Sequence, residues 1–296
     1  MRLIKSYLYI IIIISSFILF SCQKEIMHHS EEIQPEEIAS NQSSIRMAIV
    51  GDSISTYAGE LVSNIDGYQG AKYIAYYPKG DVKKVEDTWW YKLALILGVK
   101  YNNICNCSWS GSRVTGDSNS TNNASAGCST KRISDLSYKG FIPDIVICFI
   151  SCNDWAADIP IGDWDISAPI PEEGITSTFR EAYALMLFKI QQHYPSSKVV
   201  CLTILDDKKR DRTLGWPSNN SNGVTIEEWN QSIKEISEAF GCLTIDLQDC
   251  GINYDNISMY AVDDGLHPNS TGMTLIARKV ASDLTPILEE LEAARL

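Results

Sequence analysis

The sequence predicts an α/β fold, a three-layer α/β/α sandwich around a central, mostly parallel five-stranded sheet. Two observations support this prediction. Five short apolar runs have the composition of buried strands, and segments with helical periodicity separate them. Strands that alternate with helices form parallel sheets whose two faces are covered by helices. Because the sequence shows neither an internal repeat nor a change of composition beyond residue 45, we expect one domain over residues 45–296.

The first half of this domain provides three predicted strands and one predicted helix. Residues 46–50 form a short apolar run, and residues 88–97 have helical spacing and end at Gly98. Residues 103–108 fit a second strand. Residues 144–150 are continuously apolar after their first position, which is typical of a strand buried on both faces.

The second half provides two strands and three helices. The strands cover residues 198–205 and 242–247, and the helices cover residues 176–193 before Pro195, residues 225–240 before Gly241, and residues 271–295 with Asn269 or Ser270 as cap. Proline cannot continue a helix and glycine commonly follows one, so both residue types mark helix ends.

The composition and charge exclude several functions. The chain has 296 residues, of which 45% are hydrophobic and 21% charged, an ordinary balance for a globular protein. Its 25 basic and 37 acidic side chains leave a formal charge of -12. Binding to nucleic acid needs a basic surface, and anionic lipid repels an acidic protein. We therefore expect no nucleic-acid partner and no direct binding to a lipid surface.

Residues 1–21 have the pattern of an export signal. Basic residues precede an apolar run over residues 7–20, and no acidic residue occurs before Glu25. The run ends in Leu-Phe-Ser-Cys, which resembles the bacterial lipobox; the lipobox cysteine, here Cys22, is acylated and becomes the mature N-terminus. The alternative is an uncleaved membrane anchor, but about fourteen apolar residues are short for a span of about 20.

Residues 22–44 have the composition of a flexible tether behind this lipidated cysteine. They contain five glutamates and one proline and lack apolar periodicity. The adjacent His28 and His29 have no partner at metal-ligand spacing, so we expect no metal there. Because no aspartate follows Cys22, the sequence favours a lipid-anchored protein of the bacterial outer membrane, on its periplasmic face or at the cell surface.

Four polar clusters occupy the positions where a parallel sheet binds its ligands. Residues 51–55, 108–112 and 151–154 each follow a predicted strand, and residues 263–269 precede the final helix. Ligands of open parallel sheets gather beyond the carboxyl ends of the strands. We therefore expect these clusters to meet at one edge of the sheet.

The clusters contain the groups that acyl transfer needs. A serine hydroxyl, here Ser53, is a weak nucleophile until a base removes its proton. Of the four histidines, two lie in the tether and His193 lies at the end of a predicted helix, which leaves His267 as the base. Asp264, three residues earlier, can accept a hydrogen bond from one ring nitrogen and leave the other for Ser53.

In order and spacing these blocks resemble the SGNH hydrolases, also called the GDSL esterase and lipase family. The match rests on Gly-Asp-Ser at residues 51–53, Gly111, Asn153, and Asp264 with His267, and it extends over the whole predicted domain. The resemblance implies a flavodoxin-like sheet, Ser53 as nucleophile, His267 as base and Asp264 as its orienting carboxylate. It also implies an oxyanion hole formed by the Ser53 and Gly111 N–H groups and the Asn153 amide.

Three positions bear on this expected site. Gly116 follows Gly111 closely, so either glycine is a candidate donor. Ser151 stands where the family usually has glycine, which alters the loop and leaves Asn153 in place. Cys152 has no second histidine in reach, so we expect no catalytic role for it. The sequence lacks Gly-x-Ser-x-Gly and His-Glu-x-x-His motifs, and we expect neither a cofactor nor a metal.

The expected reaction is hydrolysis of a carboxylic ester through an acyl-enzyme. Trp109 and Trp155 adjoin the glycine and asparagine blocks; flat aromatic faces suit sugar rings, although tryptophans equally pack cores. An acidic enzyme tethered in the cell envelope suits an acetylated polysaccharide, so we expect removal of O-acetyl groups from carbohydrate. A lipid or general short-chain esterase is one alternative, and a glycan-binding surface lipoprotein without catalysis is an alternative of another class.

Eight cysteines besides the lipobox cysteine lie in a domain predicted to be exported, which permits disulfides. Cys107 and Cys128 bracket a polar loop that a bridge between them would close, and Cys105 is a competing partner. Cys148 and Cys201 lie in predicted strands, where we expect small buried hydrophobic side chains.

Overall fold

The computed structural model describes residues 43–60, 75–121, 125–165, 167, 170–206 and 219–295. The predicted signal sequence, the predicted lipidation site Cys22 and the predicted tether up to residue 42 lie outside the described residues, and the predictions for them stay predictions. In the described part of the chain, no helix combines the length and the apolar character that crossing a membrane requires.

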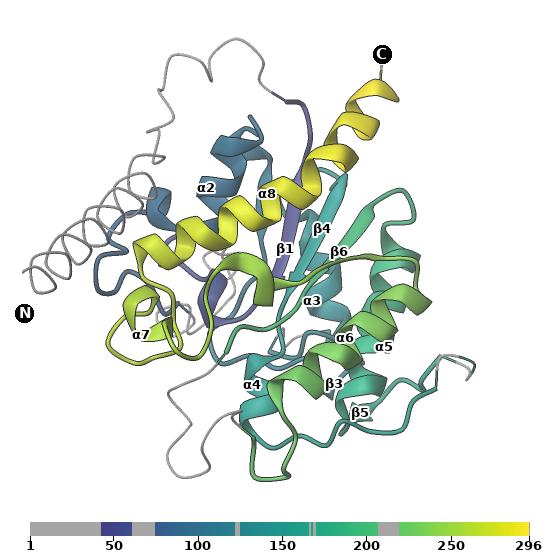
Figure 1. Cartoon of the computed structure of the whole chain (residues 1–296). Coiled ribbons are helices and arrows are strands. Elements are labelled where there is room, and N and C mark those ends of the chain that lie inside the picture. The colour runs from purple at the N-terminus through teal and green to yellow at the C-terminus, as the bar shows by residue number, and fades with distance from the viewer. Residues whose placement is uncertain are drawn as a thin grey trace, which may run out of the picture. The chain divides into compact units, whose positions relative to one another are not determined.

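A five-stranded sheet forms the centre of the domain (Figure 1). Its strands are β1 (Met47–Gly51), β2 (Ile104–Asn106), β4 (Ile145–Phe149), β6 (Lys198–Leu202) and β7 (Leu243–Ile245), in the spatial order β2-β1-β4-β6-β7. All four neighbouring pairs run parallel. Counted along the chain, this is the 2-1-3-4-5 order of flavodoxin-like folds, so the predicted fold class is confirmed.

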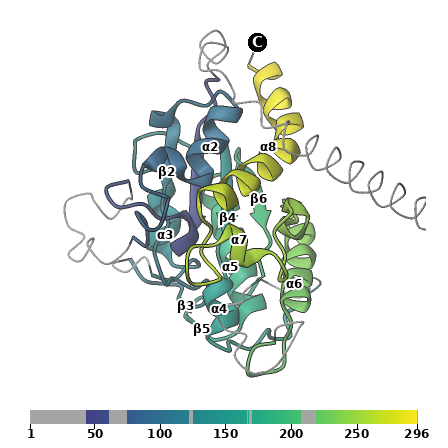
Figure 2. The ribbon, with the colours of Figure 1, turned by 60° about the vertical axis from the view of Figure 1, so that its left-hand side comes forward.

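Helices cover both faces of this sheet (Figures 1 and 2). On one face α2 (Trp89–Ile96) packs against α8 (Ser270–Ala293). On the other face α5 (Phe179–His193) contacts both α3 (Thr130–Ser134) and α6 (Ile226–Ala239). Right-handed crossovers place α2 on one face and α3, α5 and α6 on the other, because the connection from β1 to β2 runs across the sheet in the direction opposite to the later connections.

Side-chain caps fix where three of these helices begin. α2 follows Thr88, whose hydroxyl accepts a hydrogen bond from a backbone N–H of the first turn. α6 begins with a capping box, in which Thr225 and Glu228 each accept from the backbone N–H of the other. Asn269 caps α8 by accepting from the Gly272 N–H at 2.9 Å, which is one of the two caps that we predicted.

The start of α5 differs from the prediction. Thr176 lies in β5 (Ile175–Thr176), which pairs antiparallel with β3 (Gly116–Asp117). Thr176 Oγ1 also accepts from the Gly116 N–H at 2.9 Å, so the chain stays extended here and the helix begins three residues later, at Phe179. Two-residue strands have no period that the sequence can display, which is why the prediction missed them.

Short helical turns, which we did not predict, complete the described part. They are α4 (Cys152–Ala156), α7 (Ile257–Tyr260), and the 3-10 turns η2 (Ser53–Ser55), η5 (Val85–Asp87), η6 (Tyr101–Asn103), η7 (Asp135–Ser137) and η8 (Leu247–Cys250). A single turn shows too few apolar repeats for a helical period to be recognised. Two of these turns, η2 and α4, carry residues of the expected site.

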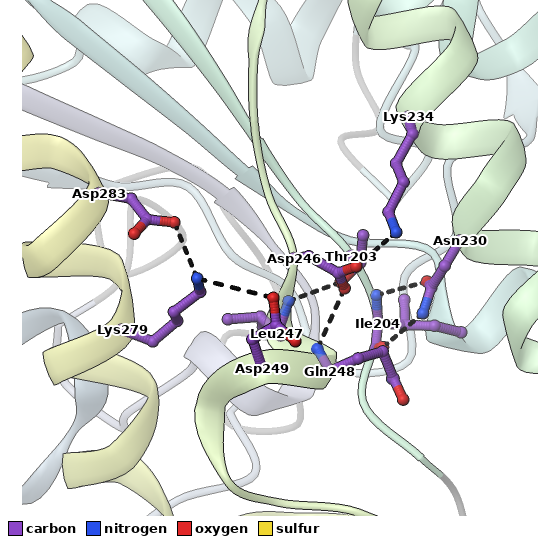
Figure 3. A network of polar contacts seen from close by, with 10 residues as sticks. All are labelled: Thr203, Ile204, Asn230, Lys234, Asp246, Leu247, Gln248, Asp249, Lys279 and Asp283. Atoms are coloured by element: carbon purple, nitrogen blue, oxygen red, sulfur yellow. Dashed lines mark hydrogen bonds and ion pairs between the residues drawn. The ribbon is translucent and has the colours of Figure 1, made fainter.

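A polar network joins the last two long helices to the carboxyl ends of β6 and β7 (Figure 3). Asp246, directly after β7, accepts a hydrogen bond from Thr203 Oγ1 at 2.9 Å and forms an ion pair with Lys234 of α6. Lys279 of α8 lies 4.0 Å from Asp249 in η8. The network thus links α8 to the turn after β7, while the packing of α8 on α2 holds the helix in place.

No disulfide joins the eight cysteines that the structure describes. Cys107 Sγ donates to a backbone carbonyl of η7 at 3.0 Å, and Cys128 Sγ lies 3.5 Å from a threonine hydroxyl of β5. The bridge between Cys107 and Cys128 is therefore absent because the two thiols contact different elements, and Cys105 forms no bridge either. Cys148 and Cys201 are both buried, as predicted, and the structure places them opposite each other on β4 and β6.

Candidate active site

The serine of the Gly-Asp-Ser cluster lies in the turn after the central strand β1. Asp52 caps this turn, since its Oδ1 accepts from the Ile54 N–H at 3.1 Å. Gly51 leaves no room for a side chain, because a Cβ there would lie 2.5 Å from Ser108 Oγ. The turn places Ser53 at the carboxyl edge of the sheet with 4% of its surface exposed.

The histidine loop is a tight turn built around a carboxylate. Asp264 Oδ1 accepts from the backbone N–H groups of Leu266 at 3.1 Å and His267 at 2.9 Å. Gly265 has a φ of 69°, in the left-handed region that favours glycine. An aspartate side chain stabilises such a turn by accepting hydrogen bonds from the backbone N–H groups of the residues that follow it. The turn therefore brings a carboxylate and an imidazole three residues apart to the same side.

The structure brings the three predicted catalytic side chains together. His267 Nε2 lies 2.7 Å from Ser53 Oγ, and His267 Nδ1 lies 2.6 Å from Asp264 Oδ2. The imidazole is buried, with 5% of the residue exposed. A hydroxyl, a base and a carboxylate that orients the base are the arrangement that activates a serine nucleophile.

Two carboxyl groups of the site have pKa values that are shifted in opposite directions. Burial by itself raises the pKa of Asp264, but hydrogen bonds from the ring and backbone of His267 and from the Tyr76 hydroxyl outweigh burial and lower the pKa. Burial raises the pKa of Asp52, and the Cys152 thiol, which donates to Asp52 Oδ2 at 3.0 Å, opposes this only in part. Asp264 is therefore ionised at neutral pH.

The donors expected for an oxyanion lie on neighbouring strand ends. Gly111, with a φ of 75°, lies in a turn closed by the Ser112 N–H, which donates to the Trp109 carbonyl at 3.1 Å. Neither the Ser53 N–H nor the Gly111 N–H donates to another of the described residues. Asn153 Nδ2 donates to the Ser112 carbonyl at 3.0 Å, and the amide has a second hydrogen. Each of the three groups thus has a hydrogen available for a ligand oxygen.

Gly116, the alternative donor, is already engaged. Its N–H donates to Thr176 Oγ1 at 2.9 Å within the β3–β5 pair. A Cβ at Gly116 would lie 2.8 Å from the Ala126 Cβ, so this glycine is required by packing. These contacts favour Gly111 over Gly116 as the backbone donor.

Asp154 holds the segment that follows Gly111, a role that the sequence prediction missed. Its Oδ2 accepts from the Val114 N–H at 2.7 Å, and its Oδ1 accepts from the N–H and hydroxyl of Thr115 at 3.0 and 2.8 Å. Complete burial raises the pKa of Asp154 to about 6, although these hydrogen bonds oppose the shift. In the sequence, the position of Asp154 directly after Asn153 was the one hint of its role. A carboxylate buried there needs several hydrogen-bond donors, which the segment after Gly111 provides.

Tyr76 is a second residue that the prediction missed. Its hydroxyl donates to Asp264 Oδ2 at 2.7 Å, and its ring stacks on the His267 ring with the centroids 3.5 Å apart. Tyr76 lies 188 residues before Asp264, and no motif surrounds it. No pattern in the sequence marked this contact.

One of the two tryptophans expected at the substrate lies elsewhere. Trp155 is 1% exposed, and its Nε1 donates to the Val224 carbonyl at 3.0 Å. The prediction that Trp155 binds substrate is therefore wrong, because this side chain packs the core. Trp109 is half-buried beside the Gly111 turn, and its contact with substrate stays a prediction.

Ser151 has a backbone conformation that favours glycine, the residue that the family usually has here. Its φ is 125°, and a non-glycine residue in such a conformation costs about 1–3 kcal/mol. The Ser151 hydroxyl accepts a hydrogen bond from Trp229 Nε1 at 3.2 Å, which offsets part of this cost. Asn153 keeps its place on α4, as expected.

A polar cavity of about 370 Å³ adjoins the Gly111 turn. Its wall includes the Gly111 backbone, four hydroxyl-bearing residues and two charged residues, which are Ser112, Thr115, Ser120, Ser125, Arg113 and Asp117. Hydroxyl, guanidinium and carboxylate groups are hydrogen-bonding partners for a polar ligand. The cavity therefore suits a hydroxylated molecule bound next to Gly111, the one expected oxyanion donor among its lining residues.

The arrangement supports acyl transfer in its chemistry. A hydroxyl faces a base, and backbone and amide donors lie at the neighbouring strand ends where negative charge would develop on an acyl oxygen. Over the described ranges, no group of three or more His, Cys, Asp or Glu side chains is placed to hold a metal ion.

Comparisons with known proteins agree with this geometry. The family model for the GDSL-like lipases and acylhydrolases matches residues 45–214, more than half of the chain. No curated protein matches the chain. A solved structure described as a GDSL-like lipase from Bacteroides uniformis is 26% identical, with a TM-score of 0.56 over 82% of this chain and 96% of that one.

Two further solved structures share the fold at lower identity. One, described as a GDSL-like lipase from Bacteroides ovatus, is 23% identical with a TM-score of 0.55 over 82% of this chain and 100% of that one. The other, from Lactobacillus plantarum, is 20% identical with a TM-score of 0.57 over 83% and 99%. The chain therefore belongs to the GDSL-like lipase/acylhydrolase family and is a hydrolase of ester bonds.

Proposed function

We propose that the chain is a serine esterase in which Ser53 is the nucleophile, His267 the general base and Asp264 the residue that orients the base. The observation that carries this proposal is the distance of 2.7 Å between Ser53 Oγ and His267 Nε2. Because Asp264 Oδ2 lies beside Nδ1, the proton of the neutral imidazole belongs on Nδ1 and the lone pair of Nε2 faces the hydroxyl.

In the acylation step, Ser53 Oγ forms a bond to the ester carbonyl carbon while its proton moves to His267 Nε2. The Ser53 and Gly111 N–H groups and the Asn153 amide donate to the oxyanion that results. The bond from carbon to the alcohol oxygen then breaks, and His267 returns the proton to that oxygen. In deacylation, water gives a proton to Nε2, its oxygen bonds to the carbonyl carbon, and Ser53 leaves with the proton from His267.

We infer that the substrate is a carbohydrate that carries O-acetyl groups. The cavity beside Gly111 supports this inference, since its described wall holds hydroxyl and charged side chains that match the hydroxyl groups of a sugar. A fatty acyl chain needs an apolar groove instead. Trp109 lies two residues before Gly111, and this partly exposed tryptophan offers a ring for stacking against a sugar face.

A panel of esters tests the substrate class. The purified chain and its Ser53→Ala variant are incubated with acetylated xylan, acetylated pectin, a phospholipid and a short activated ester. We expect wild type to release acetate from at least one polysaccharide and Ser53→Ala to release none. Fatty acid released from the phospholipid without acetate from the polysaccharides would favour the lipase alternative, and hydrolysis of the activated ester alone would favour a general short-chain esterase.

We propose further that Cys22 carries a lipid and anchors the enzyme in the outer membrane of a bacterium. The lipobox-like residues before Cys22 and the acidic tether after it support this proposal. Expression with a labelled fatty acid should label the wild-type chain and leave Cys22→Ala unlabelled. Equal labelling of both chains would contradict lipidation at Cys22, and fractionation of the labelled chain with the inner membrane would contradict the location.

A further inference from the structure

The segment that contains Tyr76 connects the two halves of the candidate active site. Its backbone contacts the serine turn, because the Tyr76 N–H donates to Thr56 Oγ1 at 2.8 Å and Thr56 Oγ1 donates to the Ser53 carbonyl at 2.9 Å. Its side chains contact the histidine loop, where the Tyr77 hydroxyl donates to the Pro268 carbonyl at 2.6 Å. One short segment thus contacts both the serine turn and the histidine loop and holds them next to each other.

The Tyr76 side chain makes two contacts with the pair formed by Asp264 and His267. Its hydroxyl donates to Asp264 Oδ2 at 2.7 Å, and the same oxygen lies 2.6 Å from His267 Nδ1. Its ring lies almost parallel to the imidazole, with centroids 3.5 Å apart and an angle of 11° between the planes. A single side chain therefore contacts both the hydrogen-bond partner and the face of the imidazole.

We propose that Tyr76 is a positioning residue of the ester hydrolysis. It holds the His267 imidazole in the orientation in which Nε2 faces Ser53 Oγ, and it limits the negative charge that Asp264 presents to the imidazole. The inference rests on the proposed function, in which His267 is the general base, and it assigns to that site a residue outside the SGNH motif blocks.

The hydrogen bond and the stacked ring have separate effects. The Tyr76 hydroxyl shares Asp264 Oδ2 with the imidazole, so it neutralises part of the charge that would stabilise the protonated ring. Burial and this hydrogen bond raise the pKa of Tyr76, so its hydroxyl stays a donor at neutral pH. The ring blocks rotation of the imidazole away from Ser53, and its π face favours the imidazolium that forms during turnover.

Other ionisable groups lie near the pair of Asp264 and His267 or near the two tyrosines that contact it. They are Asp52 after β1, Tyr77 and Lys79 near Tyr76, Asp81, which accepts from the backbone N–H of Ser270 at the start of α8, and Asp263 next to Asp264. Lys79 Nζ, for example, lies 4.6 Å from the centroid of the Tyr76 ring. Because all of these groups remain in a Tyr76→Phe variant, a changed pH dependence reports on the Tyr76 hydroxyl.

The first test is Tyr76→Phe in the full chain, which removes the hydroxyl and keeps the ring. We expect kcat for a short activated ester to fall about 3- to 10-fold with KM unchanged, because Asp264 loses a hydrogen bond that fixes its carboxylate and therefore orients the imidazole less well toward Ser53 Oγ. The acidic limb of kcat/KM should move up by about half a pH unit, because Asp264 then stabilises the protonated imidazole more strongly. Tyr57→Phe is the control: it removes a hydroxyl that donates to the Lys83 carbonyl, and its profile should match wild type.

The second test separates the ring from the hydroxyl. Tyr76→Leu removes both, and kcat should fall about 10- to 100-fold below wild type. Thermal unfolding verifies that each variant is folded, and proton NMR follows the His267 Nδ1–H resonance without substrate. That resonance should shift in Tyr76→Phe and stay in place in Tyr57→Phe.

The outcomes distinguish this inference from the proposed function. If Tyr76→Phe hydrolyses ester with the acidic limb and the Nδ1–H resonance of wild type, the positioning role is wrong while the esterase stands. If wild type hydrolyses no ester in the panel, the proposed function fails, and the role of Tyr76 fails with it whatever the resonance does.

Discussion

Ser53 Oγ and His267 Nε2 lie 2.7 Å apart, although 214 residues separate the two side chains in the sequence. Ser53 belongs to the turn after β1, the strand between β2 and β4 in the sheet. His267 precedes α8, which packs on α2 and is linked to the turn after β7. The alignment of this pair therefore depends on the whole fold.

Asp264→Asn tests the carboxylate that orients the base. The amide that replaces one carboxylate oxygen donates where the imidazole Nδ1–H needs an acceptor, so the ring takes the wrong tautomer. We expect kcat for a short ester to fall about 1,000- to 10,000-fold with little change in thermal stability. Asp263→Asn is the matched control, because Asp263 is the exposed neighbour. Similar kcat values for the two variants would contradict the role of Asp264.

Asn153→Ala tests the oxyanion donors. The loss of one such donor typically lowers kcat about 100- to 1,000-fold, and the other two donors should keep the variant measurably active. Asn102→Ala, an exposed position at the amino end of β2, is the control and should keep wild-type kinetics. Steady-state kinetics on one activated ester compares the variants, and a kcat within threefold of wild type for Asn153→Ala would remove Asn153 from the oxyanion hole.

The buried Asp154 predicts a pH dependence of stability. Its pKa is about 6 in the folded chain against an ordinary value of 3.8, so the folded state binds more protons between these two pH values. The contribution of Asp154 to the free energy of unfolding should therefore fall as pH rises from about 4 to 6 and stay constant above. The total change is about 3 kcal/mol at most.

Urea unfolding of wild type and Asp154→Asn at several pH values isolates this effect, because asparagine does not titrate. The difference in unfolding free energy should decline with rising pH over this range. The exposed Asp163→Asn variant should parallel wild type. A difference between wild type and Asp154→Asn that is independent of pH would contradict a raised pKa for Asp154.

Arg113→Ala tests the cavity as a binding site for carbohydrate. Arg113 lines the cavity, and the substitution removes its charged hydrogen-bond donors to sugar hydroxyls. A hydrogen bond that involves a charged group contributes about 1.5–3 kcal/mol, so KM for an acetylated oligosaccharide should rise about 10-fold or more. Lys100→Ala removes an equal charge from the opposite edge of the sheet and should leave KM unchanged. Equal KM values for wild type and Arg113→Ala would show that the sugar binds outside this cavity.

The long elements of this fold were predictable because their signals are local. Residues 145–149 are apolar without interruption and form the middle strand of the sheet. Thr88 and Asn269 cap their helices because their side-chain oxygens accept hydrogen bonds from backbone N–H groups of the first turn. The antiparallel pair of β3 and β5 was not predictable, because it depends on Gly116 and Thr176, which meet only when the chain is folded.

In the candidate site, too, some residues were predictable from local motifs and others were not. Ser53, Asp264 and His267 lie in short motifs whose chemistry can be recognised residue by residue. Tyr76 lies 188 residues before Asp264 in the sequence and meets it only in the folded chain, so no local pattern contains this contact. Trp155 was predicted to contact substrate but is buried in the core. An aromatic residue beside a motif looks the same in the sequence whether it faces substrate or the core.

The most direct test of the central claim is the mass of the chain after reaction with a fluorophosphonate, which labels a serine that a base activates. Wild type should gain one label, the labelled peptide should contain Ser53, and Ser53→Ala should gain none. A full label on Ser53→Ala, or an unlabelled wild type that still hydrolyses ester, would contradict the assignment of Ser53 as the nucleophile.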